Sequence, residues 1–126
     1  MVTEKMDFKK LLRSFGYAFS GILRLVKSEQ NARIHLFVTV CAVTAGFVLN
    51  ITGSEWCVIL ILIALVWSAE AFNTSIEKLT DHLFHGYHKT ARIVKDISAG
   101  AVLICAIVAV ICGVVIFLPK IVALLF

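Results

Sequence analysis

Three long apolar stretches constrain the fold of this chain more than any other feature of its sequence. They lie within predicted spans over about residues 31–50, 55–81 and 95–118, and each span reaches the roughly 20 residues that a helix needs to cross the hydrocarbon core of a membrane. The chain of 126 residues is 60% hydrophobic with a mean hydropathy of +0.97, which is more than a water-soluble domain of this length needs. The sequence therefore predicts an all-α membrane protein, with residues 1–126 forming a single domain.

A fourth helix is predicted before the first span, over about residues 5–28. Apolar side chains recur there at helical spacing, and polar and basic side chains occupy the opposite face. The apolar face holds Phe8, Leu11, Leu12, Phe15, Phe19, Ile22, Leu23 and Val26, and the polar face holds Lys10, Arg13, Tyr17, Ser20, Arg24 and Lys27. Such a basic amphipathic helix is typical of a helix lying in the membrane interface; a soluble core helix is the alternative.

The basic residues are distributed unevenly around the three spans. They gather before the first span (Lys5, Lys9, Lys10, Arg13, Arg24, Lys27 and Arg33) and around the connection between the second and third spans (Lys78, Lys89, Arg92 and Lys95). The turn at residues 50–55 has none, and the C-terminal segment has only Lys120. By the positive-inside rule the N-terminus and the second connection are cytoplasmic, and the C-terminus is outside.

The second apolar run continues into a polar stretch, EAFNTSIEKLTD, at residues 70–81. Its polar side chains fall within an arc of about 100° on one helix face; they are Glu70, Asn73, Thr74, Glu77 and Asp81. From Trp56 to Glu77 is ~31 Å at the rise of an α-helix, which places Glu77 at the cytoplasmic boundary and Glu70 ~10 Å deeper. Charge inside the hydrocarbon is costly, so a carboxyl at that depth indicates a functional site.

The chemistry expected of these carboxyl groups differs with their depth. Glu70 is suited to accept a proton, whereas Glu77 and Glu29, at the boundary, are suited to hold a hard cation such as Mg²⁺. The same interface holds Lys95 and Asp96 at the start of the third span and Lys10, Arg13 and Tyr17 on the surface helix. Acids for a metal and bases for a polyanion indicate phosphoryl transfer to a lipid hydroxyl, although no P-loop or protein-kinase motif is present.

Other classes of protein account for less of this pattern. A small proton-coupled transporter also uses a membrane-embedded glutamate, but it gives the charged groups at the cytoplasmic interface no task. A structural membrane peptide explains neither feature. The run HLFHGYH, with His82, His85 and His88, raises the alternative of zinc, but its spacing does not place three imidazoles on one helix face.

The polar stretch EAFNTSIEKLTD, followed by KDISAGAVL at residues 95–103, resembles the signature of the small prokaryotic lipid kinases, the diacylglycerol kinase and undecaprenol kinase family. The stretches GYAFSGI and SEQNARIHL resemble the N-terminal part of the same family. The resemblance implies a homotrimer of three-span subunits in the bacterial inner (cytoplasmic) membrane, with active sites formed where subunits meet at the cytoplasmic face. It implies ATP and a membrane lipid alcohol as substrates, and no nucleic-acid partner is expected.

Carried onto matching positions, the resemblance implies roles for individual residues. Glu70 would take the proton of the lipid hydroxyl, with Asn73 supporting it. Glu29 and Glu77 would be the ligands of the Mg²⁺ bound with ATP. The remaining positions would line the nucleotide site: Lys10, Tyr17, Gly86, Tyr87, His88, Lys95 and Asp96.

The chain also departs from the proteobacterial diacylglycerol kinases at two positions. His35 stands where they carry a carboxylate, and Gly86 has no side chain where they place an acid near the adenine. The stretches NARIHL, SEW and GVVIFLPK look more like the undecaprenol kinases of Gram-positive bacteria. The sequence therefore favours undecaprenol over diacylglycerol as the substrate and assigns no role to His35.

Overall fold

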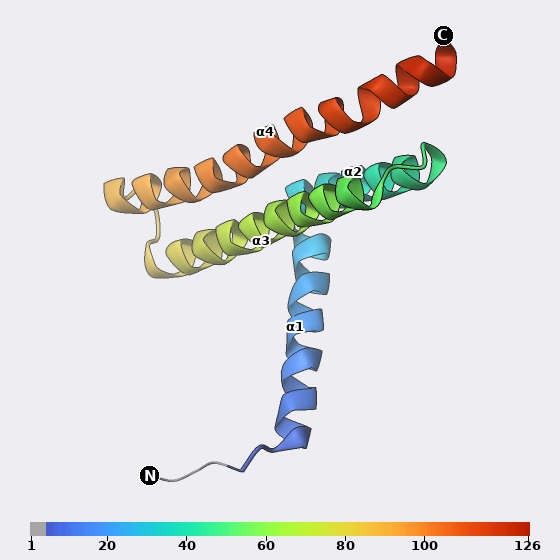
Figure 1. Cartoon of the computed structure of the whole chain (residues 1–126). Helices are drawn as coiled ribbons and strands as arrows, with labels where there is room; N and C mark the ends of the chain where they lie inside the picture. The colour runs from blue at the N-terminus through green and yellow to red at the C-terminus, as the bar shows by residue number, and fades with distance from the viewer. Residues whose placement is uncertain (1–4) are drawn as a thin grey trace.

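The computed structural model describes residues 5–126, and this part of the chain is helical without strands (Figure 1). It forms α1 (Phe8–Ser28), α2 (Gln30–Val48), α3 (Gly53–Leu83) and α4 (Lys89–Leu125). The helices α2, α3 and α4 are each long and apolar enough to cross a membrane. The predicted all-α class with three candidate membrane-spanning helices is therefore confirmed.

The helix α1 begins where Asp7 caps it. The Asp7 Oδ1 atom accepts hydrogen bonds from the backbone N–H groups of Lys9 at 3.0 Å and Lys10 at 3.4 Å, which satisfies two of the unpaired donors at a helix start. Lys5 and Met6 precede the helix, so the expected start at residue 5 is three residues too early. Figure 1 shows α1 projecting away from the layer formed by the other helices. Most apolar side chains of α1 are exposed.

A short turn reverses the chain between α2 and α3. Asn50 adopts a left-handed conformation with φ of 52°, one of the few that a non-glycine residue tolerates in a turn. The hydroxyl of Thr52 accepts from the Glu55 N–H at 3.2 Å, and the Glu55 carboxylate accepts from the Thr52 N–H at 3.1 Å. This reciprocal capping box begins α3.

The turn is tightened by close packing of Gly46 against Trp56. A Cβ atom on Gly46 would lie 2.6 Å from the Trp56 ring, closer than any real contact. The Trp56 ring also packs on Phe47 with a centroid separation of 4.9 Å. Only glycine leaves room for the indole here, so the contact between Gly46 and Trp56 lets the end of α2 pack directly against the start of α3.

The central helix α3 carries most of the buried side chains, with α2 and α4 packed along it (Figure 1). Both neighbours run antiparallel to α3. Most large apolar side chains of α4 face outward, as Ile97, Ile104 and Val110 illustrate. An apolar exterior of this kind suits contact with lipid or with other subunits.

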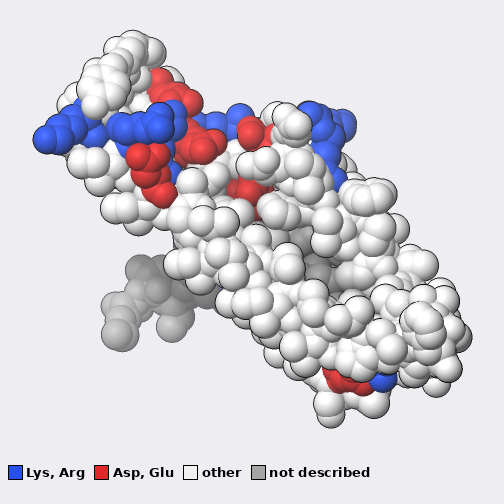
Figure 2. Space-filling view, turned by 90° about the horizontal axis from the view of Figure 1, so that it is seen from above, with Lys and Arg blue, Asp and Glu red and all other residues white. Residues whose placement is uncertain are grey.

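Charged side chains gather at one end of the three-helix layer (Figure 2). The ion pairs Lys78–Glu29, Arg92–Asp96 and Lys95–Asp81 lie in this region. At the opposite end Lys120 of α4 pairs with Glu55 of α3 at 3.2 Å. The apolar middle between these two charged ends matches the profile of a membrane-spanning unit.

The membrane-spanning helices extend beyond the apolar runs that predicted them. The helix α4 covers residues 89–125 rather than 95–118, because His88 caps it early and the helix continues through Pro119. The helix α2 ends at Val48, two residues before the expected limit, and α3 extends two residues further at each end. Caps and turns set these bounds, whereas the apolar pattern reports only the part that meets lipid.

Candidate active site

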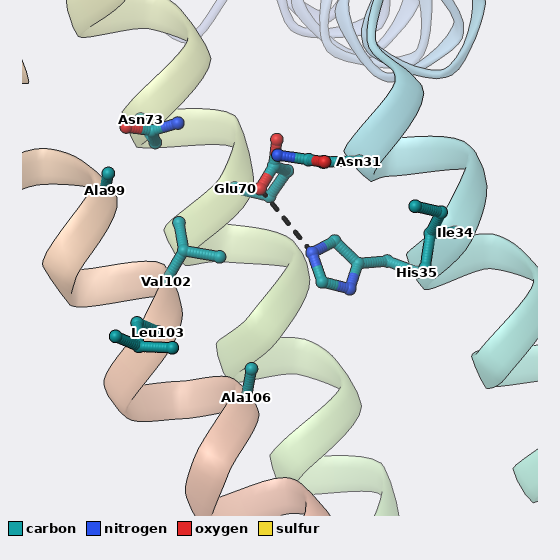
Figure 3. A pocket seen from close by; sticks show the side chains of 9 residues that line it. All are labelled: Asn31, Ile34, His35, Glu70, Asn73, Ala99, Val102, Leu103 and Ala106. Atoms are coloured by element: carbon teal, nitrogen blue, oxygen red, sulfur yellow. Dashed lines mark ion pairs between the residues drawn. The ribbon is translucent and has the colours of Figure 1, made fainter.

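A cavity of ≈ 230 Å³ lies between α2, α3 and α4 (Figure 3). Its polar side chains come from two helices, α2 and α3, and α4 closes it with apolar ones. The lining residues are Asn31, Ile34, His35, Glu70, Asn73, Ala99, Val102, Leu103 and Ala106. The cavity therefore combines an apolar wall with a small polar face, as pockets for amphiphilic substrates do.

Glu70 is the largest fully buried side chain among the described residues, with 2% of its surface exposed. Its Oε2 atom lies 3.5 Å from His35 Nε2, which is longer than a typical hydrogen bond. Within residues 5–126 that oxygen has no hydrogen-bond partner. A buried carboxyl without hydrogen bonds is costly, so the fold maintains Glu70 there at the expense of stability.

Asn73 lies one turn beyond Glu70 on the same face of α3. Its Nδ2 group donates to Glu77 Oε1 at 3.4 Å. Its Oδ1 atom is buried and accepts no hydrogen bond within the described chain. Asn73 therefore links the buried end of the site to Glu77 and leaves one hard oxygen atom available.

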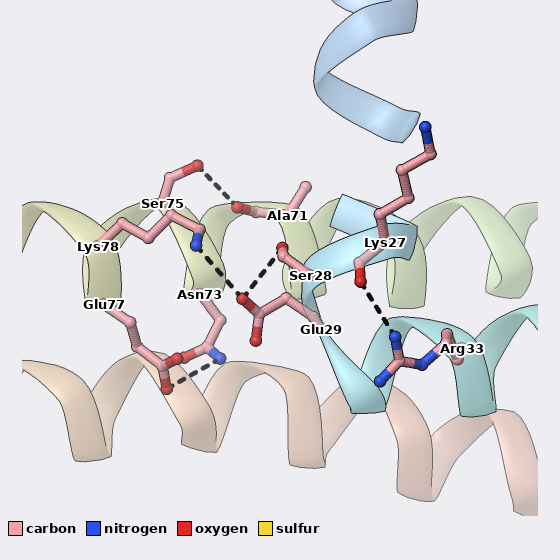
Figure 4. A network of polar contacts seen from close by, with 9 residues as sticks. All are labelled: Lys27, Ser28, Glu29, Arg33, Ala71, Asn73, Ser75, Glu77 and Lys78. Carbon is pink, nitrogen blue, oxygen red and sulfur yellow. Dashed lines mark hydrogen bonds and ion pairs between the residues drawn. The ribbon is translucent and has the colours of Figure 1, made fainter. Parts of the chain in front are cut away.

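Glu29 stands at the junction between α1 and α2, where it ends one helix and begins the next. Its Oε1 atom lies 3.5 Å from Lys78 Nζ and accepts a hydrogen bond from Ser28 Oγ at 3.3 Å (Figure 4). Lys78 directly follows Glu77 in α3, so Glu29 lies beside the turn that carries Glu77. In the view of Figure 4 the Asn73 side chain lies between the two carboxylates.

Lys95 and Asp96 lie in the second turn of α4, outside the cavity. Lys95 Nζ pairs with Asp81 Oδ1 at 2.6 Å, and this contact joins α4 to the end of α3. Asp96 pairs with Arg92 at 3.2 Å on the surface of α4. Both side chains are thus at the charged end of the molecule, but within one chain each pairs with a neighbour.

Gly86, Tyr87 and His88 belong to the short connection between α3 and α4. Gly86 has a φ of 87°, in the left-handed region that favours glycine. The Nδ1 atom of His88 accepts from the Ala91 N–H at 3.4 Å and so caps α4, and its ring stacks on Phe84 with centroids 4.3 Å apart. Tyr87 is 86% exposed.

Lys10 and Tyr17 lie on the N-terminal half of α1, the part that projects away from the other helices (Figure 1). Tyr17 is 75% exposed. Within one chain Asn73 bonds to Glu77, Glu70 lies one turn earlier on the same helix, and Glu29 pairs with Lys78, the residue after Glu77. The structure does not bring Lys10 or Tyr17 to them.

Three side chains of this region were not among the predicted site residues. His35 and Asn31 line the cavity from one face of α2, and Lys78 pairs with Glu29. The presence of two polar side chains, one turn apart, at the start of an apolar span is a signal that could have found His35 and Asn31. The contact of Lys78 with Glu29 depends on how α2 packs against α3, and no pattern in the sequence reports that packing.

The donor atoms near Glu77 fit a magnesium ion better than zinc. The described residues contain no cluster of three or more His, Cys, Asp or Glu side chains that would form a closed metal site. Mg²⁺ needs fewer protein ligands, because one or two carboxylates together with water and phosphate oxygens complete its shell. Glu29, Glu77 and the unpaired Asn73 Oδ1 offer such hard oxygen atoms.

Comparison with known proteins identifies the relatives of this chain. A family model for prokaryotic diacylglycerol kinases matches residues 16–117. The undecaprenol kinase of Bacillus subtilis is 33% identical over 114 residues, covering 90% of this chain and 93% of that protein. A diacylglycerol kinase of Synechocystis is 38% identical over 116 residues, covering 91% of this chain and 66% of that protein.

A more distant relative is a diacylglycerol kinase of Pseudomonas aeruginosa, 24% identical over 93 residues, which cover 74% of this chain and 76% of that protein. The region that the family model matches, residues 16–117, includes α2 and α3 in full and most of α4. It therefore contains the buried Glu70, the Asn73–Glu77 pair and Glu29. The chain belongs to the prokaryotic diacylglycerol kinase family and is a membrane lipid kinase.

Proposed function

We propose that this kinase transfers the γ-phosphate of Mg-ATP to the hydroxyl group of a membrane lipid alcohol, with undecaprenol favoured over diacylglycerol. The observation that carries the proposal is the position of Glu70, a carboxyl 2% exposed in a cavity between three apolar helices. A buried carboxyl beside a lipid-accessible wall is suited to remove a proton from a substrate that arrives through the membrane.

In the proposed reaction Glu70 takes the proton of the alcohol as the alcohol oxygen attacks the γ-phosphorus. The wall formed by Val102, Leu103 and Ala106 would contact the first carbons of the lipid chain and exclude water from the hydroxyl. Exclusion of water matters here because water is a competing acceptor for the phosphoryl group.

Glu29 and Glu77 are proposed to hold Mg²⁺, which when bound with ATP neutralises charge on the transferred phosphoryl group. Asn73 is proposed to orient this pair, since it donates to Glu77 at 3.4 Å and lies one turn from Glu70. In the free chain Lys78 would balance the charge of Glu29 at 3.5 Å and would have to yield when the metal binds.

The nucleotide site is proposed to form between subunits of a homotrimer. Lys95 and Asp96, with the segment Gly86–His88, lie at the charged end of one chain, while Lys10 and Tyr17 lie on the projecting α1. A neighbouring subunit would therefore be needed to bring the α1 residues near a nucleotide. The exposed apolar surface of α4 would supply a face for such an assembly.

The charged end that contains these residues is proposed to face the cytoplasm, where ATP is available. Six Lys or Arg residues precede α2, Arg33 lies in its first turn, and four more lie around the α3–α4 connection. Figure 2 shows Lys and Arg side chains gathered toward one end of the three-helix layer. The positive-inside rule then places the N-terminus inside and the C-terminus outside. The membrane would be the bacterial cytoplasmic membrane.

The choice of lipid alcohol rests on similarity. The Bacillus subtilis relative, matched over 93% of its length, is an undecaprenol kinase. Diacylglycerol is the second candidate, because relatives named diacylglycerol kinase are also similar and one of them is 38% identical.

The proposal is tested by measuring ³²P transfer from labelled Mg-ATP to undecaprenol and to diacylglycerol, side by side in the same detergent micelles. We expect transfer to both, with the larger kcat/KM for undecaprenol. A larger kcat/KM for diacylglycerol would reverse the assigned substrate. Glu70→Gln should transfer to neither lipid, and transfer by this variant at the wild-type rate would remove Glu70 as the base.

A further inference from the structure

The cavity contains a second titratable side chain that the proposed reaction does not use. His35 enters from α2 and faces Glu70 from α3 (Figure 3). The other polar side chains in the lining are the amides Asn31 and Asn73, and α4 contributes only apolar side chains. Among the described residues that line the cavity, His35 is therefore the one group able to exchange a proton with Glu70.

The geometry suits proton exchange between the two side chains. His35 Nε2 and Glu70 Oε2 are 3.5 Å apart, so a small rotation of the imidazole would bring them to hydrogen-bond distance. The side chain of His35 is 18% exposed, whereas that of Glu70 is 2% exposed. Glu70 therefore has little contact with water, and a proton could pass from it to the more exposed His35 and from there to water.

A hydrogen-bonded tie fixes His35 against α3. The hydroxyl of Thr39 donates to the backbone carbonyl of His35 at 2.7 Å, and the same hydroxyl accepts from Trp67 Nε1 at 3.0 Å. Trp67 lies three residues before Glu70 on α3. The tie therefore holds α2 against α3 about one turn from the His35–Glu70 pair, which limits how far the imidazole can move from the carboxyl.

We propose that His35 accepts the proton that Glu70 removes from the lipid alcohol and then releases it to water, so that Glu70 is ready for the next turnover. This inference rests on the proposed role of Glu70 as the base. Imidazole is suited to the task because one ring nitrogen can accept a proton while the other donates one.

The steps balance without any redox partner. The O–H bond of the alcohol breaks, its proton bonds to Glu70, and the alcohol oxygen forms a bond to the γ-phosphorus as the bond to the ADP oxygen breaks. The proton then passes from Glu70 Oε2 to His35 Nε2, and from the imidazole to water or buffer. Both side chains return to their starting protonation states.

Three variants separate proton transfer from structural support. His35→Gln keeps an N–H donor of similar reach but cannot carry a proton, and His35→Ala opens space in which free imidazole can bind. Thr39→Val is the matched control, because it removes the hydrogen bond from Trp67 but retains the imidazole side chain of His35. Each variant is purified in micelles, and its melting temperature and its binding of Mg-ATP are compared with those of the wild type.

We expect kcat to fall roughly 10- to 100-fold in both His35 variants, with KM for the lipid changed less than about twofold. Free imidazole should raise kcat of His35→Ala in a saturable way. Among methylated imidazoles of similar size, the rescued rate should follow the basicity of the compound. Thr39→Val should show no response to imidazole, whatever its own rate.

The inference is overturned if His35→Gln has the kcat of the wild type, or if rescue of His35→Ala does not depend on the basicity of the added compound. The activity of Glu70→Gln tests separately whether Glu70 is the base. If Glu70→Gln is inactive while His35→Gln is fully active, only the role of His35 fails. If Glu70→Gln is fully active, the proposed base fails as well.

Discussion

Three glutamates near one end of α3 have the same side chain but different surroundings. Glu70 is buried, and its Oε2 accepts no hydrogen bond in the described chain. Glu77 accepts one from Asn73, and Glu29 faces the ammonium group of Lys78. A buried carboxyl with a free oxygen can reach the hydroxyl of a lipid substrate, whereas carboxylates beside water can share a hard cation with phosphate oxygens. Their surroundings therefore support a division into one base and two metal ligands.

Glu70→Gln should lower kcat by roughly 10²- to 10⁴-fold, because the amide cannot accept the proton of the alcohol. Binding of Mg-ATP should stay close to that of the wild type, since the proposed metal ligands are intact. Transfer of ³²P to undecaprenol gives kcat, and calorimetric titration gives the affinity for Mg-ATP. Glu55→Gln, which changes a carboxyl at the opposite end of α3, serves as the control. A variant of Glu70 that loses nucleotide binding as well would place this carboxyl in the metal site instead.

Glu77→Gln and Glu29→Gln should each raise the Mg²⁺ concentration needed for half-maximal activity, because each removes one hard anionic ligand. Saturating Mg²⁺ should restore part of kcat, which it should not do for Glu70→Gln. The measurement is a titration of ³²P transfer against free Mg²⁺ at fixed ATP. If the titration curve of either variant coincides with that of the wild type, that residue is not a metal ligand.

At the scale of helices, much of this site follows from the sequence because α3 is one regular element. The spacing of Glu70, Asn73 and Glu77 predicts a common face at graded depth, and the structure places the Asn73–Glu77 contact on it. The His35–Glu70 pair joins α2 to α3, and its register depends on how the two helices pack. The polar pair Asn31 and His35 at the start of an apolar span could mark a site, but no pattern within either helix reports that His35 faces Glu70.

The bounds of the helices show the same limit. Apolar runs predict that spans exist, but α1 begins at the Asp7 cap and α4 begins at the His88 cap. Both caps lie outside the apolar runs. Close packing is equally hidden, since the contact between Gly46 and Trp56 depends on the turn at Asn50.

Gly46→Ala should lower the melting temperature, because its Cβ would meet the Trp56 ring at 2.6 Å. Overpacking of this kind costs about 1–3 kcal/mol, and it should separate the end of α2 from the start of α3. Gly21→Ala is the control: no atom lies within 4 Å of a Cβ at that position, and alanine favours a helix over glycine. Circular dichroism during heating in micelles gives both values. Equal melting temperatures for Gly46→Ala and wild type would show that the indole moves aside without cost.

At the scale of the whole molecule, one chain leaves much of itself uncovered. The face of α4 that carries Ala101, Cys105, Ala109 and Gly113 has small side chains at every fourth position, and the space beside Gly113 is open within the described chain. Small residues let helices from different subunits approach closely. The projecting α1 likewise has few contacts with the rest of its own chain (Figure 1). Both features support the proposed homotrimer with sites between subunits.

Mixing two inactive variants tests whether subunits share each site. Glu70→Gln removes the proposed base, and Lys95→Ala removes a proposed nucleotide contact that pairs with Asp81 in its own chain. If one site draws these two residues from different subunits, some mixed trimers contain one site with both residues intact. We therefore expect ³²P transfer to reappear when the two variants are unfolded together and refolded as a mixture.

The amount of recovered activity measures how many mixed trimers contain an intact site. Random assembly in equal proportions makes mixed trimers the majority, so recovery should be a sizeable fraction of the wild-type rate and should vanish when the variants are refolded separately and then combined. Crosslinking of differently tagged chains verifies that mixed trimers form. If they form and stay inactive, Glu70 and Lys95 serve each site from the same chain, and the Lys95–Asp81 pair would then fix α4 beside the carboxyl face of its own α3.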